Sequence, residues 1–137
     1  YVLESLTKYV KEQPEGEVWV AEHHGRIAGS IAIVRTDEKT AQLRWFLIEP
    51  EYRGTGLGRQ LMTVAMDYCQ RKNFNHVYLW TFQELEAARH LYKSFGFELG
   101  EQVESNTWKN GVVEERWIKK TVAHISNSQS SRLTPYP

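Results

Sequence analysis

This chain is poor in cysteine, since Cys69 is the only one among its 137 residues. It can therefore form no intrachain disulfide, and it offers no set of thiolates for a structural zinc site. Neither sign of charge is in excess, because 17 Lys and Arg balance 17 Asp and Glu. Phosphate affinity comes largely from clustered Lys and Arg, so this balance argues against a protein that binds nucleic acid through bulk charge.

Long hydrophobic runs are also missing. No apolar run approaches the roughly 20 residues of a membrane-spanning helix, and no charged-then-apolar signal segment opens the chain. We therefore expect a cytoplasmic protein with no membrane partner. Aromatic residues, by contrast, are abundant, with five Trp, seven Tyr and five Phe. Such side chains supply a large apolar area, either to a core or to a binding cleft.

The order of apolar patterns predicts one mixed α/β domain over residues 1–120. Apolar residues at helical spacing predict helices, and short runs of β-forming residues predict strands. We expect helices over residues 3–10, 57–69 and 85–95, and strands over residues 18–21, 27–34, 43–48, 76–82, 97–107 and 112–118. This order fits a mostly antiparallel sheet in which a crossover helix joins the third and fourth strands. The strand over residues 43–48 is nearly all apolar, which favours burial on both faces.

Local signals define several turns and ends. His23 and His24 precede a glycine and favour a hairpin turn, and Gly96 stands where a helix ends in a left-handed residue. Asn110 followed by Gly111 is the strongest short hairpin signal in the chain. Residues 121–137 contain four Ser and two of the four prolines. We expect this segment to be a flexible tail.

The most informative stretch joins the strand that ends at Ile48 to the next helix. Gly54, Gly56 and Gly58 alternate there, which lets the backbone approach a ligand without Cβ clashes. The N–H groups and partial positive charge at the start of a helix suit a phosphate or pyrophosphate. A nucleotide-hydrolase loop would need Gly-Lys-Ser/Thr, and a dinucleotide loop would need glycine where Arg59 stands. The alternative to an anion site is a glycine-rich turn without a ligand.

Arg53, Gly56 and Gly58 satisfy a third pattern, Arg/Gln-x-x-Gly-x-Gly/Ala. In this respect the chain resembles the GNAT acetyltransferase superfamily, whose motif of this form binds the pyrophosphate of acetyl-CoA. Residues 88–97 are similar to a second motif of that family, Ala-x-x-Leu-Tyr-x-x-x-Gly-Phe. Two motifs in the expected order make a chance match improbable.

A narrower resemblance rests on three shorter segments. Residues 42–46, 79–81 and 87–92 are similar to the acetyltransferase half of bacterial proteins that fuse a MarR-type DNA-binding domain to a GNAT domain. No such DNA-binding half is present in this chain. We therefore expect no direct binding of nucleic acid.

The resemblance implies an acetyltransferase with acetyl-CoA as cosubstrate and an amine of unknown identity as acceptor. The backbone of Leu47 and Ile48 would pair with the pantetheine arm and lie close to the thioester carbonyl. Main-chain N–H groups would hold the pyrophosphate, from Arg53, Gly54, Thr55, Gly56, Leu57, Gly58 and Arg59. A non-catalytic acyl-CoA sensor or regulatory module is the alternative function.

Tyr92 matches the tyrosine that is proposed in the family as general acid. A phenol with a pKa of about 10 is protonated at neutral pH and can donate its proton to a departing thiolate. The spacing of Tyr92 from Leu85, Ala88 and Leu91 also suits a residue that only packs its helix onto the sheet. Both roles stay open.

Two positions depart from the family pattern. Leu85 stands where the second motif often has an Asn that contacts the cofactor, so Thr81 or Gln83 would have to replace that contact. Trp80 stands where some relatives carry a Glu that resembles a base. Glu49 is a candidate base and a chain of water molecules is an equal one, so the base stays unassigned. The departures motivate the sensor alternative.

The acceptor side is less defined. Trp45 and Trp80 either wall an acceptor pocket or belong to the core. Arg44 interrupts an apolar strand and needs a partner, which is either a substrate carboxylate or a nearby Glu.

We expect no metal site, and we expect Cys69 to be inert core. A homodimer is compatible with these features. The family usually has a strand and a helix ahead of residue 3, and these are absent, undetected or cut away.

Overall fold

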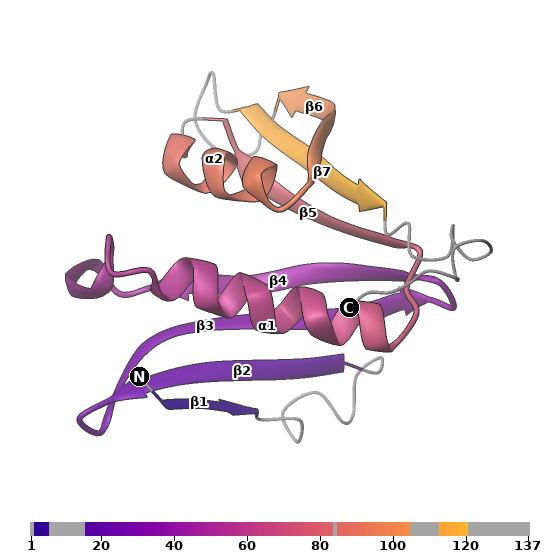
Figure 1. The fold of residues 1–137 in the computed structure, drawn as a ribbon. Helices are drawn as coiled ribbons and strands as arrows, with labels where there is room; N and C mark the ends of the chain where they lie inside the picture. The colour runs from indigo at the N-terminus through magenta and orange to yellow at the C-terminus, as the bar shows by residue number, and fades with distance from the viewer. Residues whose placement is uncertain (1, 6–15, 84, 105–112, 121–137) are drawn as a thin grey trace.

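The computed structural model describes residues 2–5, 16–83, 85–104 and 113–120. They form a seven-stranded sheet in the order β1-β2-β3-β4-β5-β7-β6, and both helices lie on one face of it (Figure 1). The elements are β1 (Val2–Ser5), β2 (Gly16–His23), β3 (Arg26–Asp37), β4 (Thr40–Ile48), the 3-10 turn η2 (Pro50–Tyr52), α1 (Leu57–Arg71), β5 (His76–Phe82), α2 (Glu86–Ser94), β6 (Glu98–Glu104) and β7 (Val113–Lys120). Only β4 and β5 pair in parallel. The predicted mixed, mostly antiparallel α/β fold is confirmed.

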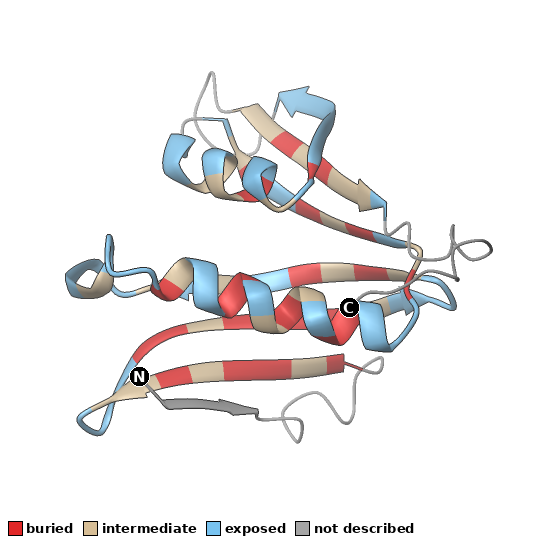
Figure 2. Cartoon of the chain, in the orientation of Figure 1, coloured by how far each residue is buried: buried red, intermediate tan, exposed pale blue. Residues whose placement is uncertain are grey.

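The crossover helix α1 is the centre of the core. Its apolar face lies on the sheet, and residues at helical spacing along it are buried, including Leu57, Leu61, Ala65 and Cys69. The buried stripe is visible along the inner side of the helix (Figure 2). The residues predicted to face the core are therefore the ones that are buried. Their packing fixes the position of the α1 N-terminus on the sheet. Among the described residues, no helix is long and apolar enough to cross a membrane.

Cys69 behaves as the inert core residue that its helix position predicted. Burial raises the pKa of its thiol from the ordinary 9.0 to about 12, so the reactive thiolate is scarce at neutral pH.

We expect the folded protein to react with a thiol reagent at pH 8 far more slowly than the protein in denaturant. Between pH 9.0 and about 12 the unfolded thiol ionises first, so the free energy of unfolding falls as pH rises. Cys69→Ala should weaken that fall in denaturant titrations; an unchanged slope would contradict this account.

The structure contradicts the prediction for the start of the chain, and some other predictions concern residues that it does not describe. The helix predicted over residues 3–10 is wrong where it can be compared, because residues 2–5 form β1, which pairs antiparallel with β2. Backbone pairing to a sheet edge outweighs a short helical period, which is a weak local preference. The remainder of that segment, the Asn110 and Gly111 hairpin signal and the predicted tail over residues 121–137 lie outside the described residues.

The strands β4 and β5 separate after a short parallel seam. Their pairing covers only Thr40 to Gln42 against His76 to Tyr78, and the ribbons diverge toward the end that carries the glycine loop (Figure 1). An extra residue in β4 forms a bulge against β3 between Arg44 and Leu47, and Trp45 there has a φ of 52°. Leu47 is 64% exposed. The predicted burial of this strand on both faces is therefore wrong, because the splay removes its neighbour on one side.

Candidate active site

Two of the three alternating glycines have a backbone conformation that favours glycine. Gly54 has a φ of 78° and Gly56 a φ of 90°, both in the left-handed region that disfavours residues with a Cβ. Gly56 is also the N-cap of α1, and it provides no side chain to cap the helix. Its carbonyl accepts the first helical hydrogen bond, from Gln60, at 3.1 Å. The loop thus opens α1 with its first N–H groups uncapped.

These uncapped N–H groups are the candidate anion site. Within the described part of the chain, the N–H groups of Leu57, Gly58 and Arg59 have no recorded acceptor. They stand at the positive end of a helix of 15 residues, where partial charge from the aligned peptides favours an anion. The arrangement therefore suits a phosphate or pyrophosphate group and uses no excess of basic side chains.

The segment ahead of the loop is held by the β2–β3 hairpin. The Tyr52 hydroxyl and His23 Nδ1 share a hydrogen bond of 2.9 Å, and their rings meet edge to face. The Thr55 hydroxyl donates to the Tyr52 carbonyl at 2.6 Å. Arg26 and Glu51 form an exposed pair at 3.6 Å, which contributes little. His23, one of the two histidine residues that the sequence placed in a turn, thus contacts the segment ahead of the loop.

The end of β4 presents backbone groups toward the splay. The Glu49 N–H donates to the Ala28 carbonyl of β3 at 2.9 Å. Because backbone groups alternate between the two sides of a strand, the Ile48 N–H is directed away from β3. On that side the described residues supply no strand partner beyond Gln42. This N–H is therefore available to an extended ligand that runs along β4.

Packing brings three predicted parts together at this end. A Cβ on Gly58 would lie 3.4 Å from Leu91 Cδ2, 3.7 Å from Phe46 Cζ and 4.0 Å from Ile48 Cδ1. The N-terminus of α1 is therefore in contact distance of both β4 and α2. The Arg59 side chain points to the end of α2, where it donates to the Ser94 hydroxyl at 3.3 Å and lies over the Phe95 ring. Its main-chain N–H remains for an anion.

Tyr92 is positioned by the way α2 ends. Gly96, with a φ of 94°, closes a Schellman motif in which the Phe97 N–H donates to the Tyr92 carbonyl and the Gly96 N–H to the Lys93 carbonyl. Lys119 Nζ donates to the Phe95 carbonyl at 2.7 Å. The Tyr92 ring lies 6.1 Å from the Phe46 ring, centroid to centroid. The second motif thus delivers Tyr92 to the end of β4.

The Tyr92 phenol is buried, and burial raises its pKa from 10.0 to about 12. It therefore stays protonated at neutral pH. No described residue is recorded as a hydrogen-bond partner of its hydroxyl. Tyr92 packs in the core as the structural interpretation predicted, and it also carries an uncommitted proton as the catalytic interpretation requires.

Two of the predicted acceptor residues, Arg44 and Trp80, share the face of the sheet opposite the helices. Gln42 pairs with Tyr78, so alternation places Arg44 and Trp80 on that same face. The β5 residues that alternate with them, among them Leu79, are buried in the core under the helices. Trp45 is 46% exposed and Trp80 is 40% exposed, so the core alternative for these two residues is wrong.

Arg44 is exposed, and its guanidinium lies 5.7 Å from the centre of the Trp45 ring. The alternative of a nearby Glu is not borne out among the described residues, which record no ion pair to Arg44. The other candidates are also exposed: Glu49 faces solvent, and Leu85 is 48% exposed as the N-cap of α2. No cluster of His, Cys, Asp and Glu suited to a metal occurs within the described ranges.

Comparison with known proteins agrees with this geometry. The model of the Acetyltransferase (GNAT) family matches residues 2–97. The chain belongs to the GNAT family. N-acetyltransferase family 8 member 3 of Rattus norvegicus is 34% identical over 85 residues, which is 58% of the chain and 37% of that protein. Spermidine N(1)-acetyltransferase of Escherichia coli (strain K12) is 30% identical over 106 residues, which is 76% of the chain and 56% of that protein. The chain therefore spans only part of the length of these relatives.

A solved structure supports the fold of this GNAT chain. The crystal structure of a GNAT family acetyltransferase from Elizabethkingia anophelis, with acetyl-CoA bound, has a TM-score of 0.68 at 17% identity. The similarity covers 77% of the chain and 76% of that protein. At this identity the similarity concerns the fold, and the residue roles rest on the geometry given above.

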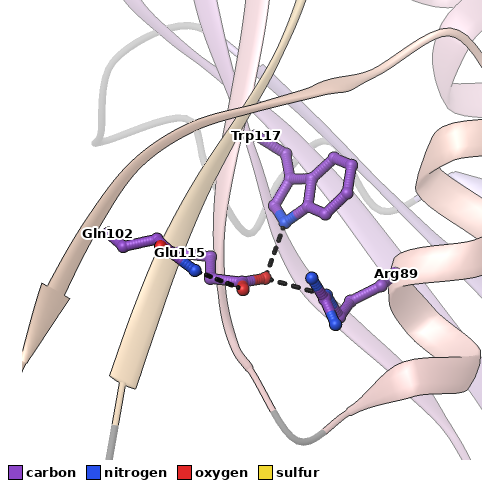
Figure 3. A network of polar contacts seen from close by, with 4 residues as sticks. All are labelled: Arg89, Gln102, Glu115 and Trp117. Carbon is purple, nitrogen blue, oxygen red and sulfur yellow. Dashed lines mark hydrogen bonds and ion pairs between the residues drawn. The ribbon is translucent and has the colours of Figure 1, made fainter.

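Sequence reasoning missed one polar group of this GNAT domain. Glu115 on β7 is 0% exposed and contacts residues of α2, β6 and β7 (Figure 3). In the sequence it follows Glu114 in a charged stretch, and nothing distinguishes the two acids. The available signal was alternation, since Glu115 shares the β7 face of the buried Trp117.

Proposed function

We propose that this GNAT chain is an acetyl-CoA-dependent N-acetyltransferase whose acceptor is a primary amine. The observation that carries the proposal is the convergence of three features at one end of β4. They are the uncapped N-terminus of α1, the outward Ile48 N–H and the buried Tyr92 phenol. Acetyl-CoA supplies an anionic pyrophosphate and an activated acetyl thioester. Those two groups need an anion site, a strand-like partner and an acid.

Each group has a defined role in the proposed reaction. The main-chain N–H groups of residues 54–59 bind the pyrophosphate. The contact predicted for Arg53 is dropped, because its N–H donates to the Pro50 carbonyl at 3.2 Å. The backbone of Leu47 and Ile48 orients the pantetheine arm. The Ile48 N–H also polarises the thioester carbonyl. The acceptor nitrogen forms the new bond to the carbonyl carbon while the C–S bond breaks. Tyr92 donates its proton to the departing sulfur, and its raised pKa keeps that proton in place beforehand. The base that takes the amine proton stays unassigned, because Glu49 is exposed.

The experiment is calorimetry with acetyl-CoA, followed by a panel of amines assayed for release of free thiol. We expect binding and turnover with at least one amine. Binding without turnover across the panel would favour the acyl-CoA sensor, and no binding at millimolar acetyl-CoA would overturn both functions.

The similarity of residues 42–46, 79–81 and 87–92 to the acetyltransferase half of MarR–GNAT proteins leads us to propose that lineage for the chain as well.

The acceptor proposed here is an amine that also carries a carboxylate and an apolar group. Arg44 provides an exposed guanidinium without a recorded ionic partner, and Trp45 and Trp80 provide exposed indole rings. All three flank the splay between β4 and β5, through which an acceptor on this face would reach the thioester. A polyamine, the acceptor named for the Escherichia coli relative, would instead be repelled by Arg44.

Arg44→Gln should raise KM for carboxylate-bearing amines by about tenfold or more, since hydrogen bonds to charged groups contribute about 1.5–3 kcal/mol. The kcat should change little, because Arg44 makes no contact with the reacting atoms. The matched control is Arg71→Gln, at the exposed C-terminal end of α1. Steady-state kinetics on amino-acid and polyamine acceptors measure both effects. An equal KM change for the two acceptor classes would contradict a carboxylate contact.

A further inference from the structure

Glu115 is buried on the same side of the sheet as α2. It pairs across β5–β7 with Thr81, the other buried polar residue in the described part of the chain. Its carboxylate is fully removed from solvent, and a buried carboxylate is costly unless donors surround it. Such a residue needs an explanation beyond chance placement.

Two hydrogen-bond donors and one cation surround the carboxylate (Figure 3). Gln102 Nε2 donates to Oε2 at 3.0 Å, and Trp117 Nε1 donates to Oε1 at 3.1 Å. Arg89 Nε lies 3.0 Å from Oε1, an ion-pair distance, although its N–H is not aimed at that oxygen. Both oxygens are therefore engaged. With no exposed oxygen, Glu115 is unsuited to be the missing base.

A bulge in β6 brings one side chain of this network to Glu115. An extra residue in β6 between Leu99 and Gln102 forms a bulge against β7, after which Gln102 pairs with Glu115. Bulges re-aim side chains, and this one brings a donor from an otherwise exposed strand to the buried carboxylate. The cation, Arg89, comes from α2, so the cluster ties a helix to two strands.

The tie to α2 matters because it holds the middle of that helix, whereas the polar contacts from Arg59 and Lys119 lie at its C-terminal end. The helix is nine residues long, it has no side-chain N-cap, and Tyr92 is its only buried residue. Arg89 precedes Tyr92 by three residues, so the two lie on the same side of the helix. Tyr92 is fixed by the helix C-terminus, and Arg89 fixes the preceding turn. Without the polar tie, only apolar contacts from Ala88 and Leu91 hold the middle of α2. We therefore expect the helix to shift and to move the Tyr92 hydroxyl.

We propose that Glu115 is a positioning residue for Tyr92, acting through Arg89 to hold α2 in the orientation that acid catalysis requires. This inference rests on the proposed function of Tyr92. The inference separates an effect on proton transfer from an effect on acetyl-CoA binding, because the candidate anion site belongs to β4 and α1 and does not include the network. Loss of the network should therefore affect turnover and leave binding of acetyl-CoA intact.

The test begins with Glu115→Gln, which keeps the shape and removes the charge. We expect kcat to fall roughly 10- to 100-fold, because a misplacement of about 1 Å can cost that much, with the calorimetric Kd for acetyl-CoA unchanged. The matched control is Glu101→Gln, which breaks the exposed 2.9 Å pair with Arg116 between the same two strands. It should leave kcat unchanged. Gln102→Ala is a milder variant that removes one donor, should Glu115→Gln fail to fold in thermal unfolding.

The decisive readout is a double-mutant cycle with Tyr92→Phe. If Glu115 acts through the acid, Glu115→Gln should have almost no further effect on kcat once the Tyr92 hydroxyl is absent. Losses that multiply, an unchanged kcat in the single variant, or a parallel loss of acetyl-CoA binding would each overturn the positioning role. A parent chain that turns over while Tyr92→Phe keeps full activity would overturn the acid assignment and this inference with it. A parent chain without any turnover would overturn the proposed function itself.

Discussion

Gly56→Ala is expected to raise the Kd for acetyl-CoA by about tenfold or more. Gly56 has a φ of 90°, and a residue with a Cβ costs about 1–2 kcal/mol in this conformation. No atom lies within 4 Å of the added Cβ, so the effect is conformational and not a clash. The loop should relax toward negative φ and turn its N–H groups away from the anion. Calorimetry measures the loss directly, and a β-branched residue at the same position should lose more.

Gly58→Ala is the matched control two residues further on. Gly58 lies within α1, and its added Cβ would meet Leu91 and Phe46 at 3.4 Å and 3.7 Å, which are ordinary contacts. Acetyl-CoA binding should therefore survive. Equal losses in the two variants would mean that the loop tolerates no added bulk anywhere, and the conformational explanation for Gly56 would then be wrong.

Tyr92→Phe is expected to lower kcat by about 10²- to 10⁴-fold, the usual contribution of a positioned general acid. The phenyl ring keeps the packing against Phe46 and Phe97, so the Kd for acetyl-CoA should stay unchanged. Tyr78→Phe, which removes a half-buried hydroxyl from the other face of β5, is the control. Rapid-quench measurement of the chemical step separates this effect from product release. Full activity in the variant would show that Tyr92 serves packing alone.

The pH dependence of Tyr92 has a definite sign. Because burial raises its pKa to about 12, loss of this proton should cause no fall of kcat in the neutral and mildly alkaline range. Between pH 10.0 and about 12 the unfolded phenol ionises before the folded one, so this residue makes the free energy of unfolding fall as pH rises. The phenylalanine variant should lack that contribution in denaturant titrations at alkaline pH.

Much of the fold follows from local patterns in the sequence. The period of α1 is strict, and the same residues that repeat every three to four positions are those that are buried. Gly96 ends α2 in the left-handed conformation that the sequence predicted. The glycine loop is equally local, because its conformation depends on residues that have no Cβ. Such features can be predicted since neighbours in the sequence determine them.

Other features depend on residues that are distant in the sequence. The splay of β4 from β5 begins after Gln42 and is followed by an extra residue in β4 opposite β3, and nothing in an apolar run reveals either feature. The burial of Glu115 requires Gln102, Trp117 and Arg89 to converge from three elements. The identity of the short strand at residues 2–5 depends on an edge of β2. In each case tertiary pairing decides an outcome that local propensity leaves open.

The short parallel seam between β4 and β5 has a mechanical consequence. Along the backbone, three residue pairs join the half of the sheet that carries the anion loop to the half that carries Tyr92. The shared side-chain core joins the two halves as well. Under the proposed function, one half holds the acyl donor and the other supplies the proton. Packing at Thr40 to Gln42 would therefore contribute to the alignment of donor and acid.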